Sequence, residues 1–243
     1  MPRLARRVLR SRDRVHWQKD RNTRDMSIHH HPSDSWLIRY AAGRLPDSFR
    51  RVIESHVTVC ERCAEAVDDA TVMSAVACNS IAPAKLNFDV DAFIGDLDED
   101  DVAGPDQVKR EEAPSVDLVS LIDQFVEVGG LESLRWRPAG RGVSFVRLRN
   151  GFDEGRLWLL RAAPGTVLPQ HAHRGDELTL VLKGAYFNRN QLFAAGDIEE
   201  ADEFVEHKPM VTDGEECICL AATDAPLKFR GWLPRISQAV TRL

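Results

Sequence analysis

The feature that most constrains the fold is a His/Cys set inside a short stretch of helical sequence. His56-x3-Cys60-x2-Cys63 falls within residues 32–78, where apolar residues recur at helical spacing. A core built from so short a stretch is marginal unless a metal ion or a disulfide bond stabilises it. The first residues lack the apolar core of a secretory signal, so a close cysteine pair indicates a metal or redox site before a disulfide. The sequence therefore predicts a small helical unit built around a metal.

Three short helices are predicted in this stretch. Ser33 or Asp34 can cap the first, over residues 36–42, and the glycine that follows is a stop signal. Pro46 starts the second helix, in which apolar residues recur every three or four positions. The third starts near Glu61, and the apolar positions beyond it allow it to continue. Each helix is too short to provide a large core of its own.

The His/Cys set needs a fourth ligand to make a tetrahedral zinc site. If His56 ends one helix and the two cysteines open the next, a short turn brings the three together, and the helix N-terminus lowers the thiol pKa. The candidates for the fourth ligand are His29, His30 and His31, and we choose His31 because it adjoins the first helix. Two thiolates and two neutral imidazoles leave a Zn²⁺ site without net charge. Such a site supplies on the order of 10 kcal/mol of folding free energy.

Composition changes near residue 98. Residues 86–97 form an amphipathic segment, and acidic residues followed by Gly-Pro and Ala-Pro indicate an exposed linker. From residue 115, short apolar or alternating runs separated by Gly and Pro predict an all-β sandwich or barrel. The clearest strand predictions are 143–148, 156–161, 178–182 and 217–222. We predict a basic extension at 1–25, a helical domain at 26–98, an acidic linker at 99–114 and a β domain at 115–243.

A second set of ligand types lies in the β domain. The pattern G-x5-H-x-H-x3-E-x6-G runs from residue 165 to 184 and is similar to the cupin motif at every fixed position. His171 and His173 alternate on a strand, so both point to one face, the barrel interior, and Glu177 follows after a turn. In cupins a final histidine usually comes from a later strand, and His207 is the one histidine after His173. The second cupin motif is weaker, because residues 195–197 keep its Gly-Asp turn but lack the flanking prolines.

Other interpretations of these residues stay open. The cupin-type ligands suit Zn²⁺, Fe²⁺, Mn²⁺ or Ni²⁺ alike, and the histidines could instead serve only as hydrogen-bonding groups. Cys60 and Cys63 could be small buried residues of a helical core, and Cys78 has no partner at a suitable spacing, so we interpret it as a small apolar residue. Cys217 and Cys219 share one face of a strand, either as a redox element near the metal or as packing residues.

The charge distribution limits the choice of partner. The formal net charge is −6, and residues 1–25 carry nine Arg or Lys and three Asp, which leaves −12 for the rest. An acidic body argues against direct nucleic-acid binding and suits a basic protein partner. We interpret residues 1–25 as a solvated tail, or as the result of a start codon assigned too early, with Met26 a more plausible first residue. The alternatives are an arm that binds nucleic acid and a targeting peptide. No apolar run approaches the length of a membrane span.

Together the two ligand sets resemble the ChrR-type anti-sigma factors, which join a zinc-binding anti-sigma domain to a cupin. The resemblance covers nearly everything from Met26 to the C-terminus. The pairing of the two halves makes it specific, since either motif alone would be much less so. Its carriers are His30-His31-Pro-Ser-Asp, Tyr40-Ala-Ala-Gly, the His56/Cys60/Cys63 set, Arg135-Trp136, the stretch from His171 to Leu182 and the stretch from Cys217 to Leu227.

The resemblance implies a cytoplasmic protein of mixed class, in which a small zinc-stabilised helical anti-sigma domain precedes an all-β cupin (jelly-roll) barrel. The helical domain would bind an ECF sigma factor and block its access to RNA polymerase, with Zn²⁺ on His31, His56, Cys60 and Cys63. The cupin would be the response module, releasing the sigma factor on signals such as singlet oxygen or organic peroxides. A second divalent metal, which we expect to be Zn²⁺, would lie on His171, His173, Glu177 and His207. Neither direct nucleic-acid binding nor a membrane is implied.

Two other function classes compete with this interpretation. A metal-dependent cupin dioxygenase or isomerase with a helical appendage is possible, because a three-His, one-Glu site leaves coordination positions open. Against it, a simple cupin enzyme has no need of an N-terminal zinc domain, and we expect a protein that is not an enzyme. The other class is a zinc-stabilised transcription factor that contacts DNA, and the basic residues 1–25 are the only support for it.

We also expect part of the sigma-factor interface to be apolar. Some apolar residues of the first helix, among them Trp36, Leu37 and Tyr40, and of residues 86–97 should contact the sigma factor.

Overall fold

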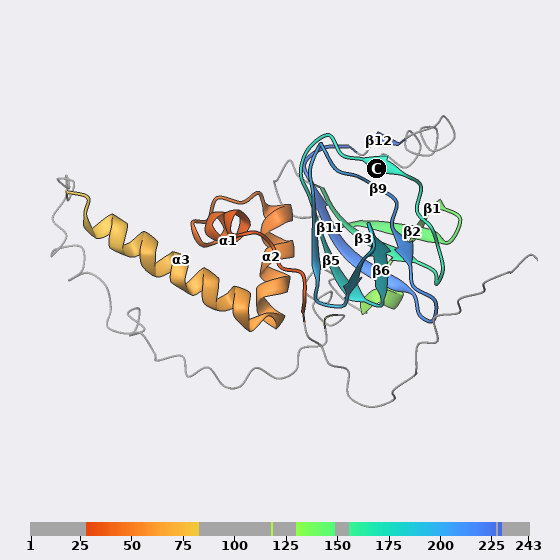
Figure 1. Cartoon of the computed structure of the whole chain (residues 1–243), viewed down its shortest axis with the longest axis horizontal. Coiled ribbons are helices and arrows are strands. Elements are labelled where there is room, and N and C mark those ends of the chain that lie inside the picture. The colour runs from red at the N-terminus through yellow and green to blue at the C-terminus, as the bar shows by residue number, and fades with distance from the viewer. Residues whose placement is uncertain (1–27, 83–117, 119–129, 149–155, 227, 230–243) are drawn as a thin grey trace, which may run out of the picture.

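Three helices precede a set of short strands (Figure 1). The computed structural model describes residues 28–82, 118, 130–148, 156–226 and 228–229. The order of helix and strand agrees with the predicted fold class. The basic head, residues 86–97 and the predicted linker at 99–114 lie outside the described residues. The helices are α1 (Asp34–Ala41), α2 (Asp47–Val59) and α3 (Glu61–Asn79), and a 3-10 turn, η3 (Gly130–Ser133), precedes the strands.

The helix boundaries follow the local sequence signals. Gly43 ends α1 with a positive φ of 63° and donates its N–H to the carbonyl of Tyr40, which is the glycine stop that the sequence predicts. Pro46 has the fixed φ that suits the residue before α2. Between α2 and α3 a single residue, Cys60, has extended backbone. The chain therefore turns sharply at this cysteine, and His56 and Cys63 lie on either side of the turn.

The strands form three sheets. A six-stranded sheet has the order β1-β2-β3-β11-β5-β8, and two three-stranded sheets have the orders β10-β6-β7 and β12-β4-β9. The described strands thus have a cupin-like arrangement without one closed hydrogen-bonded ladder, which modifies the predicted barrel. The strands are β1 (Arg137–Gly140), β2 (Val143–Leu148), β3 (Arg156–Ala162), β4 (His171–Ala172), β5 (Glu177–Lys183), β6 (Ala185–Asn188), β7 (Gln191–Ala194), β8 (Ile198–Ala201), β9 (Glu206–His207), β10 (Met210–Val211), β11 (Cys217–Thr223) and β12 (Lys228–Phe229).

The centre of the large sheet is β11, which pairs with β3 on one side and β5 on the other. All seven of its residues are buried, as expected for a continuous run of small and apolar side chains. Positions on one face, such as Ile218 and Leu220, join the cluster that contacts the helices, while Cys217 and Cys219 face the other cluster. The sheet therefore has core on both of its faces.

The helical unit and the large sheet share one core. Phe49, Val52 and Ile53 of the helices belong to the same buried cluster as Leu180 and Leu220 of the sheet. Figure 1 shows α2 lying between α1 and the strands, so this helix carries the contact. A helical unit too small to bury its apolar side chains alone completes its core against the sheet.

Two interpretations of single residues need correction. Trp36 and Leu37 are buried in the shared core, with Trp36 stacked on Phe49 at 5.0 Å, so they are not free to contact a partner; Tyr40 is half-buried. The reason is that α1 turns this face toward the rest of the helical unit. Cys78 does not behave as a buried apolar residue, because it is exposed near the end of α3.

Within the described residues, no helix combines the length and the hydropathy that crossing a bilayer requires.

The shared core predicts that one truncation in a helix destabilises the protein strongly. Ile53 is fully buried, so Ile53→Ala should lower the free energy of unfolding by about 2–5 kcal/mol, because the cavity cannot collapse between two packed layers. Urea unfolding followed by circular dichroism measures this. The matched control is Val72→Ala on exposed α3, which should change the value by less than about 0.5 kcal/mol. Equal effects of the two substitutions would contradict the shared core.

Two candidate metal centres

Four donor side chains meet at the turn between α2 and α3. The donor atoms of His31, His56, Cys60 and Cys63 all lie within 4.8 Å of one another. His31 Nδ1 is 3.3 Å from the sulfurs of both Cys60 and Cys63, and His56 Nε2 is 3.3 Å from that of Cys63. This is the set of four residues that the sequence predicts as zinc ligands, now brought together by the fold.

Each donor is positioned by local structure. His56 lies in the last turn of α2, Cys60 at the break, and Cys63 in the first turn of α3, so the break folds the two cysteines back toward the histidine. His31 comes from the extended segment before α1. Of the three upstream histidines, His31 is the one whose ring reaches the sulfurs. The ring of His30 instead lies over Phe193, with centroids 4.2 Å apart.

The electrostatics of this cluster fit a cation. Burial, together with the neighbouring Cys60, raises the pKa of Cys63 to about 12, which is opposite to the lowering predicted for a thiol at a helix start. Without a nearby positive charge the Cys63 thiol therefore stays protonated. Burial lowers the pKa of His56 to about 4, which keeps the imidazole neutral with a lone pair to donate. A bound Zn²⁺ would stabilise the thiolates and accept both nitrogen lone pairs. The donor chemistry therefore suits a tetrahedral zinc site.

A second cluster lies among the strands. His171 and His207 are paired across β4 and β9, and their Nε2 atoms lie 2.8 Å apart. The Nε2 atom of His173 lies 3.0 Å from that of His207. All three side chains are buried. Three nitrogen atoms this close in a buried space could hold one cation between them.

The outer nitrogen of each of these histidines faces an oxygen. The Nδ1 atom of His171 donates to the carbonyl of Pro169 at 2.9 Å. The Nδ1 atom of His173 lies 3.4 Å from a Glu177 oxygen. For His207, Nδ1 lies 3.1 Å from a Glu199 oxygen. Where such an oxygen accepts a hydrogen bond from Nδ1, as the Pro169 carbonyl does from His171, the proton stays on Nδ1 and Nε2 can bind a metal.

Glu177 occupies a different place from the one its motif position predicts. The group whose donor atoms converge contains the three histidines without Glu177, and the carboxylate faces the outer nitrogen of His173. Burial alone would raise the pKa of Glu177, but the hydrogen bond and charge of His173 outweigh it and lower this pKa. Glu177 as a fourth ligand therefore stays a prediction.

Glu199 was not among the predicted site residues, but the structure places it beside His207. Its carboxylate accepts hydrogen bonds from Tyr186 and Asn188 as well, and all of these groups are buried. The sequence offers no clear signal for this role, because Glu199 lies in an acidic stretch, Asp197-Ile-Glu-Glu-Ala-Asp-Glu203, where charged residues are usually exposed. Its burial shows only in the fold, and a buried carboxylate needs partners.

Cys217 and Cys219 are buried, with their sulfurs 3.6 Å apart. The hydrogen bond with Cys217, followed by burial, raises the pKa of Cys219 well above its usual value. Their cluster includes Tyr186 and Phe193. Their burial suits packing, and the short separation of their sulfurs suits a redox pair.

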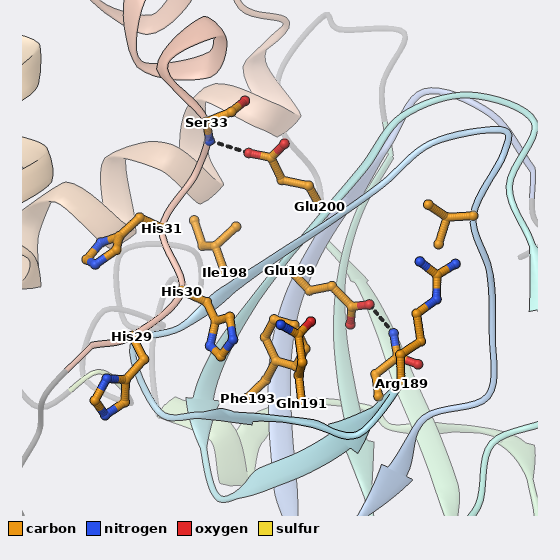
Figure 2. Close-up of a pocket in the computed structure, with 12 residues that line it drawn as sticks. His29, His30, His31, Ser33, Arg189, Gln191, Phe193, Ile198, Glu199 and Glu200 are labelled. Atoms are coloured by element: carbon orange, nitrogen blue, oxygen red, sulfur yellow. Dashed lines mark hydrogen bonds between the residues drawn. The ribbon is translucent and has the colours of Figure 1, made fainter.

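A pocket of about 400 Å³ lies between the segment before α1 and strands β6 to β8. Figure 2 shows His30 and Glu199 among its lining residues, and His31 directed toward the helices. Ser33 donates its backbone N–H to Glu200 at the rim. The pocket is therefore lined by His31 of the first cluster and by Glu199, which contacts His207 of the second.

Comparison with known proteins connects these features to one family. A family described as "ChrR Cupin-like domain" matches residues 126–226. The chain is 37% identical to the Anti-sigma-E factor ChrR of Cereibacter sphaeroides over 223 residues, which is 90% of this chain and all of that protein. A crystal structure of Rhodobacter sphaeroides SigE in complex with the anti-sigma ChrR matches with a TM-score of 0.66 and 37% identity, over 82% of this chain and all of that one.

The fold and the two donor sets thus define a protein in which a His/Cys helical unit is packed on a cupin-like domain. The chain belongs to the ChrR family of anti-sigma factors.

The geometry predicts two metal ions that can be removed separately. The Cys60→Ser/Cys63→Ser double variant should lose one metal equivalent, because two of four donors are gone, and His171→Gln should lose the other. Metal content by mass spectrometry of the purified full chain measures both. Cys78→Ser is the control, since this exposed thiol is remote from the cluster and its loss should leave both metals bound. If the double cysteine variant and His171→Gln each lost both metals, the two centres would not be separate.

Proposed function

We propose that this protein binds an ECF sigma factor and keeps it from core RNA polymerase. Family membership carries the proposal, because the relative matched over 90% of the chain is an anti-sigma factor. The matched structure is a complex of that kind of protein with SigE. The acidic body suits a partner with basic surfaces that otherwise face polymerase or DNA. A sigma factor acts inside the cell, so the proposed location is the cytoplasm, without a membrane or direct nucleic-acid contact.

An uncovered apolar face supports a protein partner. Val72, Met73 and Val76 of α3 are 63%, 73% and 65% exposed, and Ile81 beyond the helix is exposed too. In Figure 1 the C-terminal part of α3 extends away from the other labelled helices and strands. Apolar helix faces of this kind bind grooves on partner proteins. This face takes the role that the sequence assigned to Trp36 and Leu37.

Zinc in the His31, His56, Cys60 and Cys63 cluster is proposed to hold the helical unit in its binding shape. The cysteines join α2 to α3, so metal loss would free the angle between these helices. A second divalent ion, expected to be Zn²⁺, is proposed for the histidine cluster, with Glu177 as an added ligand. We assign that centre to sensing rather than catalysis.

Release of the sigma factor is proposed to follow oxidative stress, of the singlet oxygen or organic peroxide type, sensed in the cupin-like domain. The supporting observation is the close pair Cys217 and Cys219 beside the buried aromatic residues of the strands. A steady turnover of a small substrate by the purified protein would favour the enzyme alternative instead.

The proposal predicts stable capture of a sigma factor. Wild-type protein should hold an equimolar amount of the ECF sigma factor encoded beside it in a pull-down. The Cys60→Ser/Cys63→Ser variant should lose both zinc and partner, because the helices lose their common anchor. If wild-type protein ignores every sigma factor tested, the anti-sigma proposal fails and the histidine cluster should be screened for enzyme activity.

The exposed face of α3 makes a sharper prediction. Val72→Asp/Val76→Asp should weaken sigma-factor binding at least about tenfold, since two charges would be buried unpaired at the interface. Isothermal titration calorimetry measures the affinity. The control is Phe204→Asp, which changes an 85% exposed apolar residue of the cupin-like domain and should leave binding unchanged. Unaltered binding by the α3 variant would remove this face from the proposed interface.

A further inference from the structure

The two candidate metal centres are both supported by one short piece of the cupin-like domain. Residues 194–201 comprise the end of β7, a turn at Gly196 and Asp197, and β8. The turn contacts the segment and helix that supply His31 and His56. Two residues further on, Glu199 contacts His207. The weak second cupin motif includes the Gly196-Asp197 turn, but no motif relates this turn to the His/Cys cluster.

Asp197 holds the backbone that leads to His31. One carboxylate oxygen accepts the N–H groups of His29 at 2.7 Å and His30 at 2.9 Å. The other accepts the N–H of Ala194 at 2.8 Å and lies 3.3 Å from the ring Nδ1 of His30. With 1% of its surface exposed, Asp197 is fixed in this position. Asp197 therefore fixes the position of the backbone at His30, one residue before the proposed zinc ligand His31.

The carbonyl of Gly196 holds His56. The Nδ1 atom of the fully buried His56 donates to this carbonyl at 2.9 Å, which directs the Nε2 lone pair toward Cys63. Gly196 has a φ of +97°, and a Cβ here would meet the Ile28 side chain at 2.7 Å. Both the backbone conformation and the close packing require glycine. The turn therefore acts as the outer partner of a metal-binding histidine, as such carbonyls do elsewhere.

The same strand reaches the other centre. The N–H of Ile198 donates to the carbonyl of His30 at 3.1 Å, and the Ile198 side chain is buried in the shared core. Glu199 then points to the opposite side, where it meets His207, Tyr186 and Asn188. Figure 2 shows Ile198 and Glu199 extending from neighbouring positions of this strand. A displacement of β8 cannot leave either set of contacts unchanged.

We propose that residues 196–199 couple the two metal centres: the Gly196–Asp197 turn positions His31 and His56, and Glu199 positions His207. The inference rests on the proposed metal binding at both clusters. Each ion would fix one end of the same short segment, so binding of one lowers the cost of ordering the segment for the other. Coupling of this kind is reciprocal, and each metal raises the affinity for its counterpart by the same factor.

Cobalt provides a probe that reports on one centre alone. Co²⁺ bound to thiolates gives a charge-transfer absorption, and the proposed ligands of the histidine cluster include no cysteine. In the metal-free full chain, Asp197→Asn should raise the Co²⁺ concentration at half-maximal thiolate absorption by about 10-fold or more. The matched control, Asp213→Asn, changes an exposed aspartate of the same domain and should leave the midpoint unchanged. If Asp197→Asn does not fold by circular dichroism, Asp197→Ser carries the same expectation.

A thermodynamic cycle tests the coupling itself. His171→Gln disables the histidine cluster at a residue whose outer partner is Pro169 rather than β8. It should raise the midpoint of the thiolate absorption about 5-fold when Asp197 is present, and by much less in the Asp197→Asn background. Equal shifts in both backgrounds overturn the coupling, and wild-type behaviour of Asp197→Asn overturns the positioning role. Absence of thiolate absorption from wild-type protein refutes the proposed metal site instead.

Discussion

The position of the His56 imidazole is the constraint on which the rest of the structure depends. One ring nitrogen faces the Cys63 sulfur and the other donates to the Gly196 carbonyl, so a single buried ring joins the His/Cys cluster to the cupin-like domain. A buried imidazole with both nitrogens engaged has one tautomer and one orientation. The angle between α2 and α3, the approach of the preceding segment and the packing of α2 on the sheet all follow from this placement.

The shared apolar core adds a second connection between the helices and the cupin-like domain, beside the hydrogen bond of His56. The apolar side chains of the helices pack against the large sheet, while the far part of α3 keeps its apolar residues exposed. One end of the helical unit is thus attached to the cupin-like domain and the other is available for a partner. A change among the strands can reach the helices through packed side chains and hydrogen bonds.

Much of the fold was predictable because its signals are local. Helix ends at Gly43 and Pro46, the central strand at 217–222 and the convergence of His171 with His173 depend on neighbours in the chain. Trp36 and Leu37 were misassigned because an apolar helix face has the same sequence pattern whether it meets a core or a partner. Cys78 was interpreted as a small apolar residue but is exposed near the end of α3. The residue type alone does not show which part of a helix is buried.

The sequence by itself determined which chemistry the chain carries, since two thiols and the histidines at fixed short spacings already define two donor sets. It also determined the family, because both motifs lie within single short stretches. Only the tertiary structure decided that Glu199 supports His207 and that Asp197 binds the segment before α1. These contacts join residues up to 168 positions apart, as between His29 and Asp197. No local pattern encodes such a separation, because it is set by how the sheet and the helices pack.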